Sequence, residues 1–356
     1  MNLTFSLISF FIILLNFSCA KEDEKLVENP TDSFIKAADM SLLPLIESEG
    51  IAYNNTNNLA EDALLTLKKS GCNTIRIRLW HTPTVNQSGF NEVKSLAQRV
   101  KNLGMNVWLS VHYSDTWADP ANQQKPAAWS SLNFAQLKTA VENYTATIVN
   151  EIQPDIFQIG NEINAGFIFP EGNISANESQ FLTLLASASA VIRNNKPATK
   201  IMLHHAGIEG ATWFFSKTTT IDYDYIGLSY YPIWHGTDIN LLQQTLTNLG
   251  QTHNKKVLIA ETSYPFTLSW NDYTNNVVGL PNQIHPDYAA TPNGQKAFLE
   301  QIKNTVKNTP NGYGFCYWGS EWTAFRGTAS LNGSSWENQA LWDFNYKALP
   351  ALAVFN

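Results

Sequence analysis

The chain has 356 residues, 44% of them hydrophobic, so it can bury a large core in either one α/β barrel or two ordinary domains. Its formal net charge is −7 and it has no dense cluster of Lys and Arg, which excludes nucleic acid as an expected partner. Aromatic residues make up 12% of the chain, and their faces serve both as core filler and as platforms for sugar rings.

The apolar segment at residues 1–18 suits the core of an export signal and is short for a membrane span. Cys19 follows it, before a Lys and an acidic run, and this pattern resembles a bacterial lipoprotein signal peptide with Cys19 as the lipidated residue. We therefore expect an exported outer-membrane or cell-surface lipoprotein, tethered through residues 19–31 and touching the membrane only through its lipid. The alternative is an ordinary cleaved signal, an incidental Cys19 and a secreted or periplasmic protein.

From residue 33 onward, short β-forming runs alternate with longer amphipathic segments, as in parallel βα units. Strands are predicted at residues 34–39, 74–80, 106–112, 155–162, 200–204, 225–230, 257–261 and 313–318. Helices are predicted at residues 60–70, 92–103, 134–152, 180–194, 240–250 and 294–307. Cys72 and Cys316 lie in strand-like runs, so we expect buried free thiols and neither a disulfide nor a metal site.

This alternation predicts a single (β/α)8 TIM barrel over residues 32–356, with its active site at the C-terminal ends of the strands. A doubly wound sheet is the alternative. However, Asp39-Met40-Ser41 after the first strand is unlike the Gly-rich phosphate turn that such a sheet normally carries. No internal repeat or low-complexity linker divides the region, so we expect one catalytic domain and a monomer.

The residues at the predicted strand ends are polar or aromatic throughout, although stability alone does not require this. The fourth strand ends in Asn161 and Glu162, and the seventh ends in Glu261. In a barrel these ends meet on one face. The other residues placed on that face are Asp39, Trp80, His112, His204 or His205, Tyr230, Tyr231 and Trp318.

Two carboxyl groups across a barrel mouth match the needs of glycosidic bond cleavage. One group protonates the leaving oxygen, and the other meets the positive charge at the anomeric carbon. A separation of about 5–5.5 Å implies retention of configuration and about 6.5–9.5 Å implies inversion. Glu162 or Glu261 alone could be an end-of-strand ion pair or a helix cap, but both together, beside Asn161, favour catalysis.

The neighbouring residues suit such a site. Asn161 can hydrogen-bond the sugar 2-hydroxyl. Arg76 and Arg78 alternate along the second strand, and one of them reaching the nucleophile would keep it ionised. An ion pair that serves only folding is an equal alternative for Arg76 and a weaker one for Arg78. Trp318 either offers a flat platform for a sugar ring or fills the core. His112 could orient a carboxylate or bind a sugar hydroxyl, and the alternative is an ordinary buried histidine.

Motifs spread over residues 35–350 resemble the arabinogalactan endo-β-1,4-galactanases of glycoside hydrolase family 53. The most specific motif is His-Tyr-Ser-Asp-Thr-Trp-Ala-Asp-Pro at residues 112–120. The Gln-Ile-Gly-Asn-Glu run at residues 158–162 is similar to a wider clan of retaining hydrolases. The remaining motifs lie at residues 37–41, 76–80, 126–129, 229–234, 261–265 and 336–344.

The resemblance implies a retaining endo-hydrolase of the polysaccharide β-1,4-galactan, found in pectin and type I arabinogalactan. It makes Glu162 the proton donor and later base, and Glu261 the nucleophile. It also implies that Asp115, Trp117 and Asp119 line the cleft from the loop after the third strand. The other residues predicted to bind substrate are Asp39, Arg78, Trp80, His112, Asn161, Tyr230, Tyr231 and Trp318.

Two departures from the family pattern stand out. Residues 318–322 read Trp-Gly-Ser-Glu-Trp where the family often has Trp-Glu-Pro-Ala-Trp, so we expect a different rim there. Some bacterial relatives bind calcium in an acidic loop after the seventh strand, but residues 268–276 contain one carboxylate. We predict no metal and no other cofactor.

Two other functions stay open on the sequence. A related retaining enzyme acting on β-mannan or β-glucan would share both glutamates. A surface lipoprotein could instead capture glycan without cutting it, although the presence of both Glu162 and Glu261 argues against that.

Overall fold

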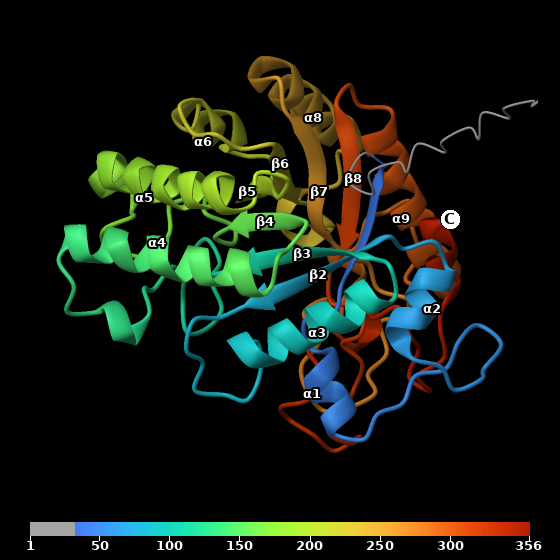
Figure 1. Cartoon of the computed structure of the whole chain (residues 1–356). Coiled ribbons are helices and arrows are strands. Elements are labelled where there is room, and N and C mark those ends of the chain that lie inside the picture. Colours follow the sequence, from blue (N-terminus) through green and yellow to red (C-terminus); the bar gives the residue numbers. More distant parts are fainter. Residues whose placement is uncertain (1–32) are drawn as a thin grey trace, which may run out of the picture.

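The computed structural model of the protein describes residues 33–356, so the predicted signal peptide, Cys19 and the tether lie outside the described residues. Within this range, eight parallel strands form one closed barrel in chain order (Figure 1). The first strand pairs with the eighth, which closes the sheet and excludes the doubly wound alternative. The predicted (β/α)8 barrel is confirmed.

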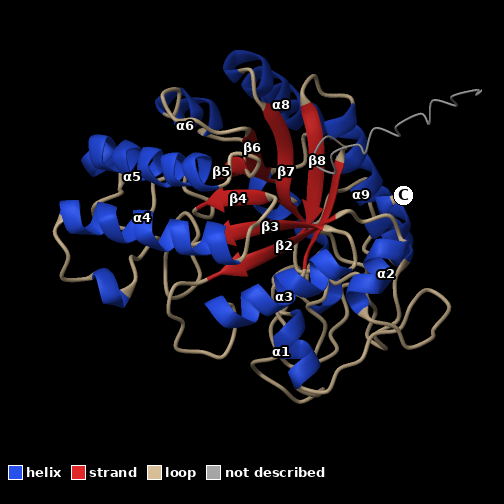
Figure 2. Cartoon of the chain, viewed as in Figure 1, coloured by secondary structure: helices blue, strands red, loops and turns tan. Residues whose placement is uncertain are grey.

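The strands lie inside and the helices outside (Figure 2). The strands are β1 Ile35–Asp39, β2 Thr74–Leu79, β3 Asn106–Val111, β4 Ile156–Ile159, β5 Lys200–Ala206, β6 Tyr225–Ser229, β7 Lys256–Thr262 and β8 Gly312–Tyr317. The α-helices are α1 Leu43–Ser48, α2 Ala63–Lys69, α3 Phe90–Asn102, α4 Phe134–Glu151, α5 Ile174–Asn195, α6 Ala211–Lys217, α7 Pro232–His235, α8 Ile239–His253 and α9 Pro292–Lys307. Short 3-10 helices lie at η2 Ala127–Trp129, η3 Pro281–Gln283, η4 Glu337–Gln339 and η5 Pro350–Phe355.

Every predicted helix is present, and most of the differences are at helix ends. α5 begins six residues before the predicted 180–194 with a short capped turn, in which the Asn173 side chain accepts hydrogen bonds from the N–H groups of Ser175 and Ala176. The backbone is non-helical at Asn177 (φ −141°), so the helix is kinked there before it continues. α1, α6 and α7 were not predicted; at six, seven and four residues they display little of a helical period, and α2, which is as short as α6, was recognised as part of a longer amphipathic segment at residues 60–70.

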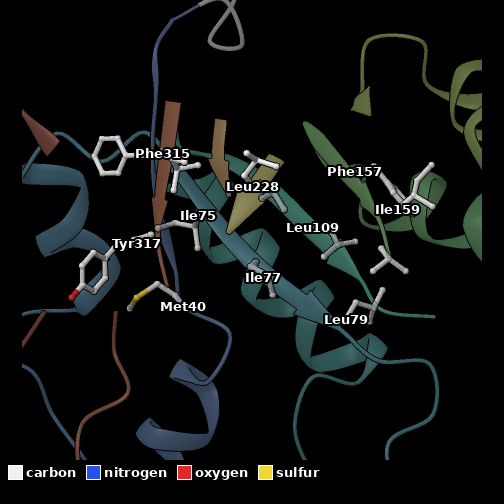
Figure 3. Packing of buried hydrophobic residues seen from close by; sticks show 14 of the residues in the cluster. Met40, Ile75, Ile77, Leu79, Leu109, Phe157, Ile159, Leu228, Phe315 and Tyr317 are labelled. Atoms are coloured by element: carbon white, nitrogen blue, oxygen red, sulfur yellow. The ribbon is translucent and has the colours of Figure 1, made fainter. Parts of the chain in front are cut away.

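Both faces of the strands are buried, and alternate side chains point in opposite directions. Ile75, Ile77 and Leu79 of β2 belong to the large apolar cluster between barrel and helices, as do Phe157 and Ile159 of β4 (Figure 3). The intervening β2 residues, Arg76 and Arg78, therefore point into the barrel. The strand period places two guanidinium groups in the barrel interior.

The barrel interior is apolar at one end and polar at the other. Its smaller apolar cluster consists of Ile35, Ala37, Trp108, Ile156, Met202, Tyr225, Leu258, Ala260 and Cys316. Polar side chains follow toward the C-terminal ends of the strands, beginning with Arg76 and Gln158. Within the described part of the chain, Cys72 and Cys316 are buried free thiols, as predicted. Among residues 33–356, no helix has the length and apolar character needed to cross a membrane.

Candidate active site

A sharp turn after β4 directs Glu162 over the barrel mouth. Gly160 has φ +73° and Glu162 has φ +46°, a left-handed conformation that is uncommon for a residue with a side chain. A Cβ on Gly160 would lie 2.4 Å from Cγ2 of Ile163, so this position also requires glycine for space. The glycine at position 160 and the left-handed backbone of Glu162 together allow a tight turn, which directs the Glu162 side chain into the barrel mouth.

Glu261 near the end of β7 faces Glu162. One carboxylate oxygen from each residue and a ring nitrogen of His204 all lie within 4.8 Å of one another. Glu261 is 6% exposed and Glu162 is partly buried. The predicted carboxylate pair is therefore brought together at the barrel mouth.

The positively charged group that contacts Glu261 is the guanidinium of Arg76. Its Nη2 donates to Oε1 of Glu261 at 2.7 Å, while Nη1 donates to Oδ2 of Asp39 at 2.7 Å. Nη2 also donates to Oδ1 of Asn161 at 2.8 Å. The hydroxyl of Tyr231 donates to the second oxygen of Glu261 at 3.0 Å. Arg76, rather than Arg78, is thus the arginine that reaches Glu261.

These neighbours distinguish the two glutamates electrostatically. Burial raises the pKa of Glu162 to about 8, and the charge of Glu261 acts in the same direction. Burial also raises the pKa of Glu261, but Arg76 and the Tyr231 hydroxyl oppose this by stabilising the carboxylate. The two groups titrate as a pair, in which Glu162 retains the proton and Glu261 carries the charge.

The pair opens into a cavity of about 540 Å³. Its walls are strongly aromatic, and the ring planes of Trp117 and Trp322 are 18° from parallel, with centroids 6.3 Å apart. Trp322 and Trp336 are also stacked, at 14° and 6.4 Å. Such flat apolar faces suit sugar rings. The aromatic residues that line the cavity are Trp117, Tyr231, Trp234, Trp318, Trp322 and Trp336, with the imidazoles of His112 and His235.

Most of the predicted substrate-binding residues line this cavity. They are Arg78, His112, Trp117, Asp119, Asn161, Tyr231 and Trp318. Arg78 is 3% exposed and its guanidinium carbon lies 3.8 Å from the centre of the Trp117 ring. Burial lowers the pKa of His112 well below its usual value, so its imidazole is neutral.

Four predicted substrate-binding residues do not line the cavity, and their side chains form hydrogen bonds with other residues around it. Asp39 binds Arg76, and Trp80 donates from Nε1 to Nδ1 of His112 at 3.3 Å. Asp115 accepts from the N–H groups of Thr82 and Ala127, at 2.9 and 2.8 Å. The Tyr230 hydroxyl donates to the carbonyl of Gly236 at 2.8 Å. Their positions at or just beyond strand ends are as predicted, but their side chains contact protein.

Three cavity tryptophans were not predicted as site residues. Trp234, Trp322 and Trp336 lie on the segments after β6 and β8, beyond the strand ends that served to select candidates. The sequence feature that could have identified them is the presence of tryptophan in the segments at residues 229–234, 318–322 and 336–344. The altered 318–322 segment contributes Trp322 to the cavity, whereas Glu321 points away and accepts the N–H of Leu42 at 2.6 Å.

Glu162, Glu261 and His204 are close enough to hold a metal ion, but protein donors already engage them. Arg76 occupies one oxygen of Glu261, and a cation placed there would lie beside the guanidinium. The one carboxylate of residues 268–276, the loop in which some relatives are expected to bind calcium, is already hydrogen-bonded to the backbone. Asp272 accepts the N–H groups of Thr274 and Ser334 at 2.6 and 3.3 Å.

Comparisons with known proteins agree with this geometry. The family model described as "Glycosyl hydrolase family 53" matches residues 35–355. The chain is 34% identical to the arabinogalactan endo-beta-1,4-galactanase of Cellvibrio japonicus over 342 residues, covering 90% of each protein. It superposes on the Ignisphaera aggregans GH53 catalytic domain with TM-score 0.86 and 34% identity, covering 91% of this chain and 96% of that one. A fungal beta-1,4-galactanase structure gives TM-score 0.79 and 30% identity, covering 91% and 99%.

The Arg76 contacts predict a large and specific cost for its removal. Arg76→Met would leave Asp39 and Glu261 buried without their shared cation, which we expect to lower the free energy of unfolding by about 3–5 kcal/mol. Arg99→Met is the matched control, because Arg99 also joins two carboxylates, Glu47 and Asp62, but is more exposed. It should cost about 1 kcal/mol or less. Urea denaturation measures both, and equal losses would contradict the assignment.

Proposed function

The chain belongs to glycosyl hydrolase family 53, and on this premise we propose that it is a retaining endo-β-1,4-galactanase. Its proposed substrate is the β-1,4-galactan of pectin and type I arabinogalactan, which the names of the relatives support. Glu162 is the proposed acid/base and Glu261 the nucleophile. The observation that carries this proposal is the approach of their carboxylate oxygens to within 4.8 Å, which suits direct attack and leaves little room for an intervening water.

In the first step, a Glu261 oxygen bonds to the anomeric carbon while the bond to the glycosidic oxygen breaks. Glu162 gives its proton to that oxygen, and the leaving sugar chain departs as an alcohol. In the second step, Glu162 takes a proton from water, the water oxygen bonds to the anomeric carbon and Glu261 is released. Two inversions at the same carbon give net retention.

The surrounding residues support these roles. Arg76 and Tyr231 stabilise the charged form of Glu261, which attack requires. The amide nitrogen of Asn161 donates to the carbonyl of Ala118 at 2.9 Å and has a second hydrogen available for the sugar 2-hydroxyl. Trp318 with Trp322 and Trp336 offers ring faces for successive sugars of a polymer, which suits internal cleavage.

Substrate choice is tested by product analysis. We expect the protein to release reducing ends from potato galactan with an early fall in chain length, and to leave mannan and cellulose derivatives intact. Glu261→Ala should lower turnover on the order of 10⁴-fold or more while the fold is kept, whereas Glu300→Ala on the exposed face of α9 should not. Activity restricted to mannan or glucan would identify a related retaining enzyme instead, and binding without cleavage would identify a glycan-capturing protein.

The pH dependence should be bell-shaped. Activity, as kcat/KM, should rise as Glu261 loses its proton and fall as Glu162 loses its proton, with the alkaline limb near its pKa of about 8. On an aryl β-galactobioside whose leaving group needs no protonation, Glu162→Ala should retain first-step activity and lose the alkaline limb. A flat profile from about pH 4 to 9 would argue against the pair.

Export and lipid attachment are proposed from the sequence pattern at residues 1–31. If Cys19 carries lipid, the protein expressed in a bacterium should partition with membranes and incorporate labelled fatty acid. Cys19→Ser should abolish both without changing galactan hydrolysis, since residues 35–355 contain the family match. Fatty acid labelling that persists in Cys19→Ser would contradict this assignment. The proposed catalytic domain acts as a monomer, which sedimentation measures directly.

A further inference from the structure

His204 in β5 and Ser229 at the end of β6 are buried residues that the mechanism above does not use, and each is 0% exposed. Together with Glu162 they form a closed ring of hydrogen bonds. The Glu162 N–H donates to Nδ1 of His204 at 3.3 Å, and Nε2 of His204 lies 2.9 Å from the Ser229 hydroxyl. The Ser229 hydroxyl donates to Oε1 of Glu162 at 2.5 Å.

Gln158 determines which nitrogen of His204 carries the hydrogen. Its carbonyl oxygen accepts from Nε1 of Trp108 at 3.0 Å and from Nε of Arg76 at 3.3 Å, which fixes the amide orientation. The amide nitrogen of Gln158 therefore faces Nδ1 of His204, at 3.0 Å. Two donors, this amide and the Glu162 N–H, thus converge on Nδ1.

Nδ1 accordingly acts as an acceptor, although Oδ1 of Asn161 also lies 3.2 Å away and is itself engaged by Arg76. Nε2 then carries the hydrogen and donates to Ser229. Burial and the charge of Arg76 lower the pKa of His204 well below its usual value, so the imidazole is neutral. The Ser229 oxygen accepts from His204, which turns its own hydrogen toward Glu162.

We propose that His204 and Ser229 are positioning residues that reserve Oε1 of Glu162 as the non-reacting oxygen, so that the catalytic proton resides on Oε2. This inference rests on the proposed role of Glu162 as acid/base. In the first step the proton leaves Oε2 for the glycosidic oxygen, and in the second step Oε2 takes a proton from water. His204 and Ser229 stay neutral and keep their hydrogens throughout.

The same imidazole supports the backbone of the β4 turn. Glu162 has φ +46°, and its N–H donates to Nδ1 of His204, while the next N–H, that of Ile163, donates to the His204 carbonyl at 2.9 Å. A left-handed residue of this kind costs free energy unless its surroundings hold it. His204 thus contacts both the backbone of Glu162 and, through Ser229, its carboxylate.

The test separates these two contacts with paired variants. His204→Asn places an amide oxygen near the position of Nδ1 but offers no donor at Nε2, and His204→Gln does the reverse. We expect Ser229→Ala and His204→Asn each to lower kcat on galactan about 10–100-fold with little change in KM. The double variant should be no worse than either single one. His204→Gln should recover most of the loss in kcat.

The pH profile gives a readout that a purely structural role would not move. The Ser229 hydroxyl stabilises the Glu162 carboxylate, so Ser229→Ala should move the alkaline limb of kcat/KM upward by about one pH unit. Ser229→Cys keeps a donor at this position, although a weaker one, so it should move the alkaline limb by less than Ser229→Ala does. The cysteine variant replaces the alanine variant in the test if the alanine variant does not fold. Ser189→Ala is the control, since Ser189 is a buried serine on α5 that donates to the Asp222 carbonyl and does not line the cavity.

An aryl β-galactobioside distinguishes the outcomes further. Because its leaving group needs no acid, the positioning variants should lose less activity on it than on galactan. Equal losses on both substrates with an unmoved alkaline limb would overturn the proposal. Failure of the underlying function would look different, because Glu162→Ala itself would then retain full activity on galactan.

Discussion

The buried guanidinium of Arg76 is the constraint on which the site depends. It is 1% exposed, and burying an unpaired cation would cost several kcal/mol. Asp39 and Glu261 pair with it from β1 and β7, strands that are far apart in the chain but are separated only by β8 in the barrel. The contact with Arg76 therefore stabilises Glu261 in its charged form and holds its Oε1 oxygen in place. The same contact contributes to the stability of the fold and to the ionisation of the proposed nucleophile.

The contrast between the two glutamates arises from their neighbours. Glu261 receives hydrogen bonds from a cation and a tyrosine hydroxyl, whereas Glu162 receives one from the neutral hydroxyl of Ser229. The two carboxylates repel each other when both are charged, because an oxygen of one lies within 4.8 Å of an oxygen of the other. The proton therefore stays on Glu162, which is the less well stabilised of the two as an anion. Identical side chains thus acquire the opposite protonation states that the proposed double displacement requires.

The sequence predicted the barrel because short β-forming runs, as expected of parallel strands buried on both faces, alternate with longer amphipathic segments. It also predicted Glu162, Glu261 and Trp318, since position at a strand end determines which face a residue joins. Strand position does not determine how far a side chain reaches. Asp39 and Trp80 therefore satisfied the criterion although they do not line the cavity, and strand position did not show that Arg76, rather than Arg78, reaches Glu261. Trp322 and Trp336 depend on loop conformation, which hydrophobic periodicity does not encode.

A perturbed pKa alone would not have located the site. Burial raises the pKa of Glu321 to about 8, the same direction and value as for Glu162, and Asp39 adds to the effect as a nearby charge. Yet Glu321 does not line the cavity, and one of its oxygens instead accepts the backbone N–H of Leu42 at 2.6 Å. Glu162 differs in facing open volume, a second carboxylate and a wall of aromatic rings. The assignment of Glu162 as the acid/base therefore depends on its position in the cavity, and the raised pKa supports that assignment only in combination with this position.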